Sequence, residues 1–338
     1  MRKVLLLAYY FPPAAASGSL RPVGLCRYLG EFGFEPHVVC SDPSSIHPPV
    51  GRDTTLGALV PPSVRVDRIQ YRNTLKELLN LRQRIRQAIS PQRVEQRGET
   101  VQNEATGEEP SAKDVILDRL FIFPDHQKYW VRPVVRHVCA LPASERPDVV
   151  LATADPWSSL LAGVSIAQRL AIPFVADFRD PWSRNPKPQP NARLLPQIVA
   201  LERRVLQKAT RVIANTEALR DSLISDHPST ADKIDAITNG FIEDMFPEAR
   251  PDGDQHTPLE LCHFGSVYPL RHPRALLEAM SDLAGSGVLS PGDLRIRFVG
   301  GWNTQDARCE ELASRLESAG FTISLRNASV PASVSDAR

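Results

Sequence analysis

The chain has 338 residues, 42% of them hydrophobic and 23% charged, which excludes a wholly disordered, collagen-like or coiled-coil protein and allows two domains or one large α/β unit. Forty basic residues against thirty-nine acidic ones leave a formal charge of +1, so no overall positive field directs the chain to nucleic acid. The five cysteines are never in C-x-x-C spacing, which indicates neither a disulfide framework nor a zinc site.

The N-terminus is an apolar run from Val4 to Phe11 that ends at a proline pair and has no small-residue cleavage site. A buried first strand explains this run better than a signal peptide does. No apolar run approaches the ~20 residues of a membrane span. We expect a cytoplasmic protein, and peripheral contact with the inner face of the membrane stays open.

The first 240 residues alternate short apolar runs with amphipathic stretches, the pattern of a parallel sheet covered by helices. Strands are predicted over residues 4–11, 36–40, 64–71, 149–153, 174–178, 211–215 and 234–238. Helices are predicted over residues 20–32, 158–170 and 194–209, and regular structure over 115–123 and 131–141.

Two further stretches interrupt this series. Residues 75–89 are predicted to form a basic amphipathic helix, either docked on the sheet with solvated arginines or lying on a membrane surface. Residues 90–114 contain almost no large apolar side chain, which predicts a disordered, dispensable insertion.

A second α/β series follows a proline- and acid-rich linker at 241–258. Its predicted strands are 259–265, 294–299 and 321–325, and its predicted helices are 273–283 and 305–318. Three strands and two helices make one mononucleotide-binding half of a doubly wound sheet. We therefore expect domain 259–338 to be incomplete, with a naturally small domain as the alternative.

Several segments at strand ends together carry a family resemblance. They are YYFPP at 9–13 with SGSLRP at 17–22, ADFRDPW at 176–182, LERRVL at 201–206 before RVI at 211–213, TNGF at 238–241 and HFGSVY at 263–268. In this order and spacing the chain resembles the family 4 glycosyltransferases, in particular the subgroup with a family-4-like N-terminal domain. The resemblance implies two Rossmann-like domains facing each other across a cleft, the GT-B type, with the acceptor on domain 1–240 and a nucleotide sugar mainly on domain 259–338.

The loop from Pro12 to Arg21 joins the first strand to the first helix, where backbone N–H groups and the helix dipole favour a phosphate. Ser17, Gly18 and Arg21 are the donor-binding candidates. The alternative is a stiff turn with Ser19 as the helix N-cap. Ala14-Ala15-Ala16 stand where the family often has paired glycines, and the absence of G-x-G-x-x-G argues against a dinucleotide oxidoreductase.

Acidic and aromatic residues at neighbouring strand ends supply the other candidates in the first domain. Asp180, Arg179 and Asp155 are the catalytic candidates, because carboxylates beside an arginine can orient acceptor hydroxyls or complement a diphosphate. A salt-bridged corner involving Asp177 is the alternative. Asp125 and Trp182 are the acceptor-binding candidates.

The second domain offers a turn and two arginines. Gly265 and Ser266 follow a strand as a phosphate-binding turn would, and Arg271, more than Arg274, is predicted to hold the diphosphate. A solvated helix start is the alternative for the arginines, and a second turn lies at Gly300-Gly301.

The resemblance implies a hexosyltransferase that moves a sugar from a nucleoside diphosphate sugar to a glycan or lipid-linked hydroxyl in cell-surface polysaccharide biosynthesis. It also implies retention of anomeric configuration, no metal and no cofactor besides the donor substrate. The family's E-x7-E pair is absent, which predicts weak or no activity for the chain as given. The alternative is a non-catalytic truncated homologue that binds a ligand or partner.

Overall fold

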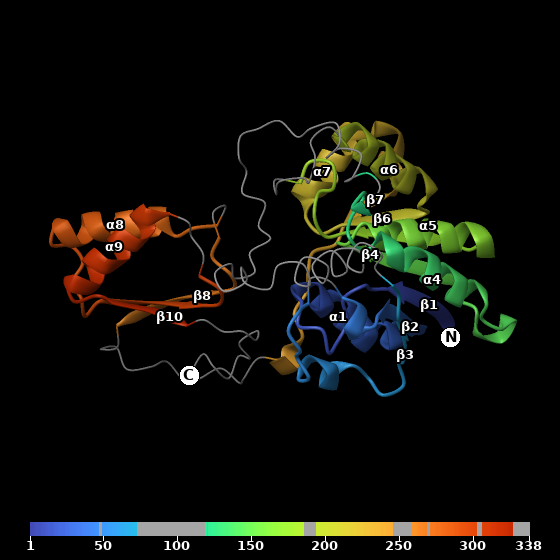
Figure 1. Ribbon diagram of the computed structural model, residues 1–338, viewed down its shortest axis with the longest axis horizontal. Coiled ribbons are helices and arrows are strands. Elements are labelled where there is room, and N and C mark those ends of the chain that lie inside the picture. The colour runs from blue at the N-terminus through green and yellow to red at the C-terminus, as the bar shows by residue number, and fades with distance from the viewer. Residues whose placement is uncertain are drawn as a thin grey trace, which may run out of the picture. The chain divides into compact units, whose positions relative to one another are not determined.

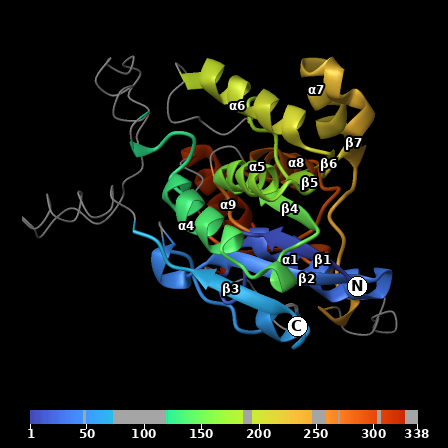
Figure 2. The ribbon, with the colours of Figure 1, turned by 90° about the vertical axis from the view of Figure 1, so that its right-hand side faces the viewer.

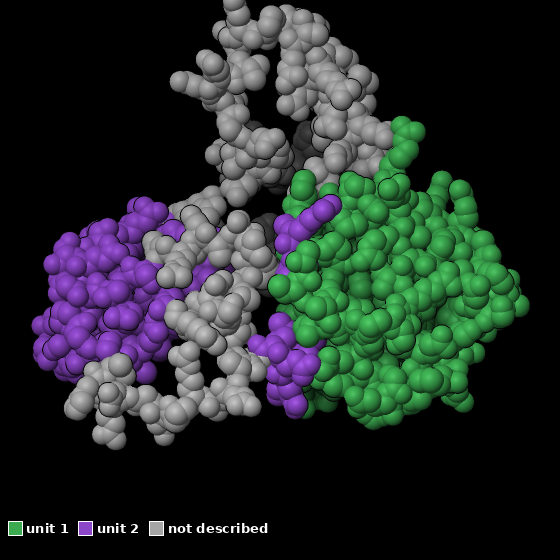
Figure 3. All heavy atoms as spheres, turned by 90° about the horizontal axis from the view of Figure 1, so that it is seen from below, with its two compact units in different colours: residues 1–50, 54–240 green, residues 51–53, 241–338 purple. Residues whose placement is uncertain are grey.

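The computed structural model describes residues 1–46, 49–72, 119, 121–185, 194–245, 258–268, 271–302 and 306–326. The chain divides into two compact units, residues 1–50 with 54–240 and residues 51–53 with 241–338, which Figure 3 colours separately. The helix predicted at 75–89 and the insertion predicted at 90–114 lie outside the described residues.

Within its described part, the first unit is built on a parallel sheet in the order β3-β2-β1-β4-β5-β6-β7 (Figure 1). The strands are β1 (Arg2–Leu7), β2 (Phe34–Ser41), β3 (Arg65–Ile69), β4 (Val149–Ala154), β5 (Phe174–Phe178), β6 (Arg211–Ala214) and β7 (Ile234–Ala236). Strand β1 pairs with β2 on one side and with β4 on the other, so the strand order reverses there. In doubly wound sheets, ligands bind beyond the carboxyl ends of the strands at such a reversal.

Helices cover the sheet of the first unit. They are α1 (Leu20–Tyr28), α4 (Lys128–Cys139), α5 (Ser158–Leu170), α6 (Leu195–Lys208) and α7 (Glu217–Asp226). Helices α4, α5 and α6 lie side by side on one face of the sheet (Figure 2). Helix α5 packs so closely that a Cβ on Gly163 would lie 2.5 Å from the Phe174 ring. Phe174, Ala176 and Phe178 therefore face α5, and Asp177 points to the opposite face.

The predicted strands of both units are present, with small differences in length. Helix α5 and strands β5 and β9 (Leu294–Val299) coincide with their predicted ranges, whereas β1 ends at Leu7 and does not continue to Phe11. Helix α7 was missed by the sequence prediction. Its signal is Thr216, whose hydroxyl caps the helix by accepting the Leu219 N–H at 3.1 Å.

The second unit has a small parallel sheet in the order β10-β9-β8 in its described part. Its elements are β8 (Leu259–Phe264), α8 (Arg274–Gly285), β9 (Leu294–Val299), α9 (Ala307–Ser318) and β10 (Thr322–Arg326). Helices α8 and α9 pack against each other, and Leu277 and Leu312 meet Ile296 and Ile323 in a separate core cluster. No described helix of the chain combines the length and the apolar character needed to cross a bilayer.

Candidate functional site at the carboxyl ends of the strands

Arg179 joins three loops at the carboxyl edge of the first sheet. It directly follows β5, and its Nε donates to the Ala154 carbonyl at 2.5 Å, its Nη2 to the Asp155 carbonyl at 2.6 Å and its Nη1 to the Gly18 carbonyl at 2.8 Å. Burial lowers the pKa of this guanidinium. The structure thus brings three predicted residues, Gly18, Asp155 and Arg179, into one cluster.

Gly18 has a steric reason to be glycine. A Cβ at this position would lie 2.7 Å from Nη1 and 2.9 Å from Nη2 of Arg179. The guanidinium fills the space that a side chain would need, so a side chain at residue 18 would have to displace the end of Arg179.

Arg21 is engaged inside the first unit. Its Nε forms a 3.0 Å ion pair with Asp177, whose side chain is 1% exposed. Its Nη1 donates to the Thr238 carbonyl at 3.0 Å and its Nη2 to the Ile237 carbonyl at 3.1 Å. The predicted salt-bridged corner at Asp177 therefore exists, but its cation comes from α1 and not from Arg179.

Several backbone N–H groups of the loop before α1 form hydrogen bonds within the loop itself. The N–H groups of Ala14, Ala16 and Ser19 bond to carbonyls within residues 11–16. Ser19 occupies the N-cap position, but its hydroxyl donates to the Ala14 carbonyl at 3.2 Å, so the expected side-chain cap is wrong. Ser17 is exposed, and its role in donor binding stays a prediction.

Asp125 lies at the start of α5 and serves as its cap. Its Oδ2 accepts the Ser158 N–H at 2.7 Å, and its Oδ1 accepts the Ser158 hydroxyl at 2.6 Å and the Gln127 N–H at 2.9 Å. Burial raises the pKa of Asp125 to about 6, although these hydrogen bonds act in the opposite direction. A carboxyl group with this pKa exchanges its proton near neutral pH.

Tyr10 and Ser158 complete this cluster and were missed by the sequence analysis. Burial raises the pKa of the Tyr10 hydroxyl, and the nearby charges of Asp155 and Asp125 raise it further. The signals for Tyr10 were its position three residues after β1 and its place in the YYFPP segment. Tyr10, Asp125 and Asp155 thus form one interacting acidic group beside Arg179.

Asp180 and Trp182 are adjacent in sequence but differ in exposure. Asp180 is exposed at the end of β5. Trp182 is 1% exposed and stacks on Trp157, with ring centroids 4.9 Å apart and planes 4° apart. In this conformation the Trp182 ring is covered, and its contact with an acceptor stays a prediction.

The predicted turn of the second unit is a close contact between two backbones. Gly265 has φ +125°, and Gly300 has φ +144°. A Cβ on Gly300 would lie 2.3 Å from the Gly265 carbonyl oxygen. The loops after β8 and β9 can therefore touch only because residue 300 is glycine, whereas Gly265 is favoured by its positive φ alone. Ser266 lies exposed beside them.

The two arginines of the second unit have different partners. Arg274 donates from Nε to Asp306 at 2.9 Å, whereas Arg271 is exposed and lies over the Tyr268 ring, 5.5 Å from its centroid. Among the described residues, His272, Asp306 and Cys309 have potential metal ligand atoms within 4.8 Å of one another. The Arg274 guanidinium on Asp306 opposes a cation there, so this group fits a metal poorly.

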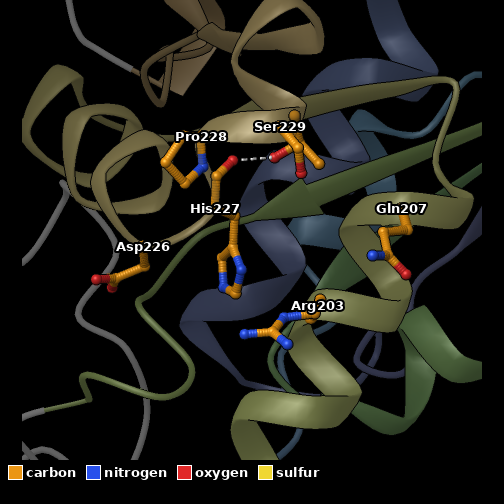
Figure 4. Close-up of a pocket in the computed structure, with 7 residues that line it drawn as sticks. Arg203, Gln207, Asp226, His227, Pro228 and Ser229 are labelled. Carbon is orange, nitrogen blue, oxygen red and sulfur yellow. Dashed lines mark hydrogen bonds between the residues drawn. The ribbon is translucent and has the colours of Figure 1, made fainter.

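A pocket of about 280 Å³ lies between α6 and the segment after α7 (Figure 4). Its walls include Arg203 and Gln207 from α6 and Asp226 and His227 from the end of α7. These helix ends lead into the starts of β6 and β7, so the pocket is at the amino end of the sheet. None of the predicted site residues lines it.

The architecture of the first unit is a doubly wound α/β fold with polar loops gathered where the strand order reverses, which places it in the doubly wound class of parallel α/β proteins. A sequence model described as Glycosyltransferase Family 4 matches residues 97–244. The matched segment, 148 of the 338 residues, is thus similar to the family 4 glycosyltransferases, and the fold is of the GT-B type.

Individual relatives agree with this placement. The chain is 27% identical over 163 residues to a D-inositol 3-phosphate glycosyltransferase of Frankia alni, a match that spans 43% of this chain and 38% of the relative. It is 32% identical over 97 residues to a D-inositol 3-phosphate glycosyltransferase of Mycolicibacterium smegmatis, covering 27% of this chain and 22% of that protein. Each match thus spans less than half of the curated relative.

Solved structures show the same fold at low identity. Anabaena Alr3699/HepE, crystallised with UDP-glucose, superposes with a TM-score of 0.51 at 15% identity, over 98% of this chain and 71% of that chain. The catalytic domain of Starch Synthase IV from Arabidopsis thaliana superposes with a TM-score of 0.54 at 10% identity, over 97% of this chain and 74% of that chain.

Proposed function

We propose that the protein is a glycosyltransferase that moves a sugar from a nucleoside diphosphate sugar to a hydroxyl of a glycan or glycolipid. The observation that carries the proposal is the Arg179 cluster, in which one half-buried guanidinium fixes the loops after β1, β4 and β5 at the strand-order reversal. The family relationship and the UDP-glucose bound to the HepE structure support a nucleotide sugar as donor.

We assign binding of the acceptor substrate to the first unit. The exposed carboxylates of Asp180 and Asp155 can accept hydrogen bonds from sugar hydroxyls, and Asp125 lies close to Asp155. Arg179 contributes by holding the loops that carry them. Gly18 and Ser17 lie on one of these loops.

The donor diphosphate is assigned to the second unit. Gly265 and Ser266 offer backbone at a strand end, and the Arg271 guanidinium is exposed beside them in sequence. An arginine can neutralise a departing nucleoside diphosphate without a metal. We therefore propose transfer with retention, without a metal or a further cofactor, in cell-surface polysaccharide biosynthesis at the cytoplasmic side of the membrane.

A thermal-shift screen with UDP-, GDP- and ADP-glucose tests the donor assignment, because a ligand that binds only the native state raises its stability. For the nucleotide that binds, Arg271→Ala should weaken affinity by about 10- to 100-fold, since a charge-assisted hydrogen bond contributes about 1.5 to 3 kcal/mol. Arg274→Ala is the matched control, because its guanidinium is already bound to Asp306. Equal affinity of the Arg271→Ala variant and the unmodified chain would remove the assignment.

A second candidate is a non-catalytic homologue that binds a nucleotide sugar or a partner. It is favoured by two predicted site residues that are engaged inside the first unit, Arg21 in its ion pair with Asp177 and Trp182 in its stack on Trp157. Binding of a nucleotide sugar without its turnover, in the presence of glycan and glycolipid acceptors, would distinguish this candidate from the transferase.

A further inference from the structure

The segment after β5 is held on both sides of Asp180. Arg179 precedes this residue and bonds to three carbonyls of neighbouring loops. After it, the Trp182 ring stacks on Trp157, and Arg184 forms an ion pair with Asp226 at the end of α7. Asp180 is thus an exposed residue of a segment whose flanks are fixed to other elements.

One buried carboxylate fixes the second flank. Glu202, in the middle of α6, is 1% exposed. Its Oε2 accepts the Ser183 N–H at 3.0 Å, and its Oε1 accepts the Ser183 hydroxyl at 2.8 Å. Backbone and side chain of the same residue are therefore bound to a single carboxylate.

His227 completes the arrangement from the far side. Its Nε2 lies 3.0 Å from Oε1 of Glu202, and the histidine is 5% exposed. Figure 4 shows His227 at the wall of the pocket between α6 and α7. Burying a carboxylate is costly unless hydrogen bonds satisfy it, and here three donors do so. The network links α6, α7 and the segment after β5.

We infer that Glu202 is a positioning residue for acceptor binding: through Ser183 it holds the segment that presents Asp180. This inference rests on the proposed transferase function. Glu202 lies in the helix layer and reaches the site only through the loop. Its contribution is the fixed geometry of that loop, because a displacement of the order of 1 Å can cost about a hundredfold in rate.

The test compares Glu202→Gln and Ser183→Ala in the full chain. The glutamine keeps the size of the side chain but replaces one acceptor oxygen with an NH₂ donor, and the alanine removes one hydroxyl bond while keeping the Ser183 N–H bond. Arg204→Gln, at an exposed position of the same helix, is the surface control. Leu223→Ala, at a 3% exposed position of α7, is the control for lost stability.

Hydrogen exchange of the residue 183 amide is the first measurement. We expect Glu202→Gln to accelerate this exchange about tenfold or more, since loss of one charged hydrogen bond weakens local protection by that order. Ser183→Ala should give a smaller increase, and the two controls should give none. Unchanged exchange in both Glu202→Gln and Ser183→Ala would overturn the inference.

The second measurement is the rate of sugar transfer to octyl glucoside as the acceptor. The donor is the one among UDP-, GDP- and ADP-glucose that stabilises the chain in the thermal-shift screen. We expect Glu202→Gln to lower kcat about tenfold or to raise the acceptor KM to a similar degree, with the donor KM unchanged. A loss no larger than that of Leu223→Ala at equal Tm would overturn the positioning role. Faster exchange at residue 183, with no transfer by any form including the unmodified chain, would instead refute the proposed function.

Discussion

Gly300 and Gly292 of the second unit differ in whether the structure requires a glycine. Gly300 combines a positive φ of +144° with a backbone neighbour that leaves no room for a Cβ. Substitution there strains the backbone and separates the loops after β8 and β9 at once. The same argument does not apply to Gly292, where a Cβ would meet nothing within 4 Å.

Gly300→Ala should therefore destabilise the second unit by about 1 to 3 kcal/mol, the cost of a strained backbone conformation, and more if the Gly265 carbonyl cannot move. Gly292→Ala should change stability by less than about 1 kcal/mol. Urea unfolding of both variants, followed by circular dichroism, measures the difference. Equal midpoints would show that the contact between residues 265 and 300 is not required for the fold.

Asp125 makes stability depend on pH in a defined direction. Its pKa in the folded state is about 6, above the ordinary value of 3.8, so the folded chain retains this proton longer than the unfolded chain does. Retaining this proton adds to the free energy of unfolding. The added stability is greatest below about pH 4, and it is lost as pH rises through about 6.

Asp125→Asn removes this titration. The Tm of the variant relative to the unmodified chain should therefore rise between about pH 4 and about pH 7. Asp232→Asn, at an exposed position, is the matched control. Calorimetry at several pH values provides the measurement, and a Tm difference that stays constant over this interval would contradict the assignment.

The sequence predicted where polar residues gather but not which partners they take. Position at a strand end was enough to group Gly18, Asp155 and Arg179, because parallel strands end at one edge of the sheet. The direction of Arg21 toward Asp177 depends on the packing of α1, which no spacing along the chain records. Residue types and strand ends therefore predicted which loops lie together better than they predicted the partner of each arginine.

At the scale of elements, α5 depends on a close approach to the sheet. A Cβ on Gly163 would lie 2.5 Å from the Phe174 ring and 3.0 Å from the Ala152 Cβ. Helix α5 also begins at Ser158, which Asp125 caps, so a shift of the helix moves residues of the candidate site. Packing inside the unit and geometry of the site are thus coupled through one helix.

Gly163→Ala should destabilise the first unit by about 1 to 3 kcal/mol, because an added methyl group in a close-packed core displaces its neighbours. Gly24→Ala in α1 is the control, since a Cβ there meets nothing within 4 Å and alanine favours a helix by up to about 1 kcal/mol. Chemical denaturation should show opposite changes for the two variants. A stabilised Gly163→Ala variant would contradict the close packing.

Element boundaries were predictable where apolar residues are continuous, as in β5 and α5. Contacts between elements could not be predicted from the sequence in this way. Asp67 on β3 accepts hydrogen bonds from Arg65, His137 and His37, so it joins β2, β3 and α4. Burial alone would raise the pKa of Asp67, but these bonds lower it to about 2. Such a junction depends on residues 30 and 70 positions away from Asp67, and local patterns cannot reveal it.

For the whole molecule, the described residues form two separate apolar cores. The first includes Val164, Phe178 and Leu206, and the second includes Leu277 and Leu312. Arg21 binds the carbonyls of Ile237 and Thr238, close to the end of the first unit at Gly240. A separate core in each unit implies that each unfolds with its own cooperativity.

We therefore expect calorimetry to resolve two unfolding transitions, each sensitive to a different core. Leu277→Ala should lower only the transition of the second unit, and Leu206→Ala only that of the first, because both side chains are 0% exposed. Truncation of a buried leucine costs about 2 to 5 kcal/mol. A nucleotide sugar that raises the transition lowered by Leu277→Ala would also locate the donor on the second unit. A single transition that both substitutions lower equally would show that the two units unfold as one, and that the separation of their cores does not extend to their stability.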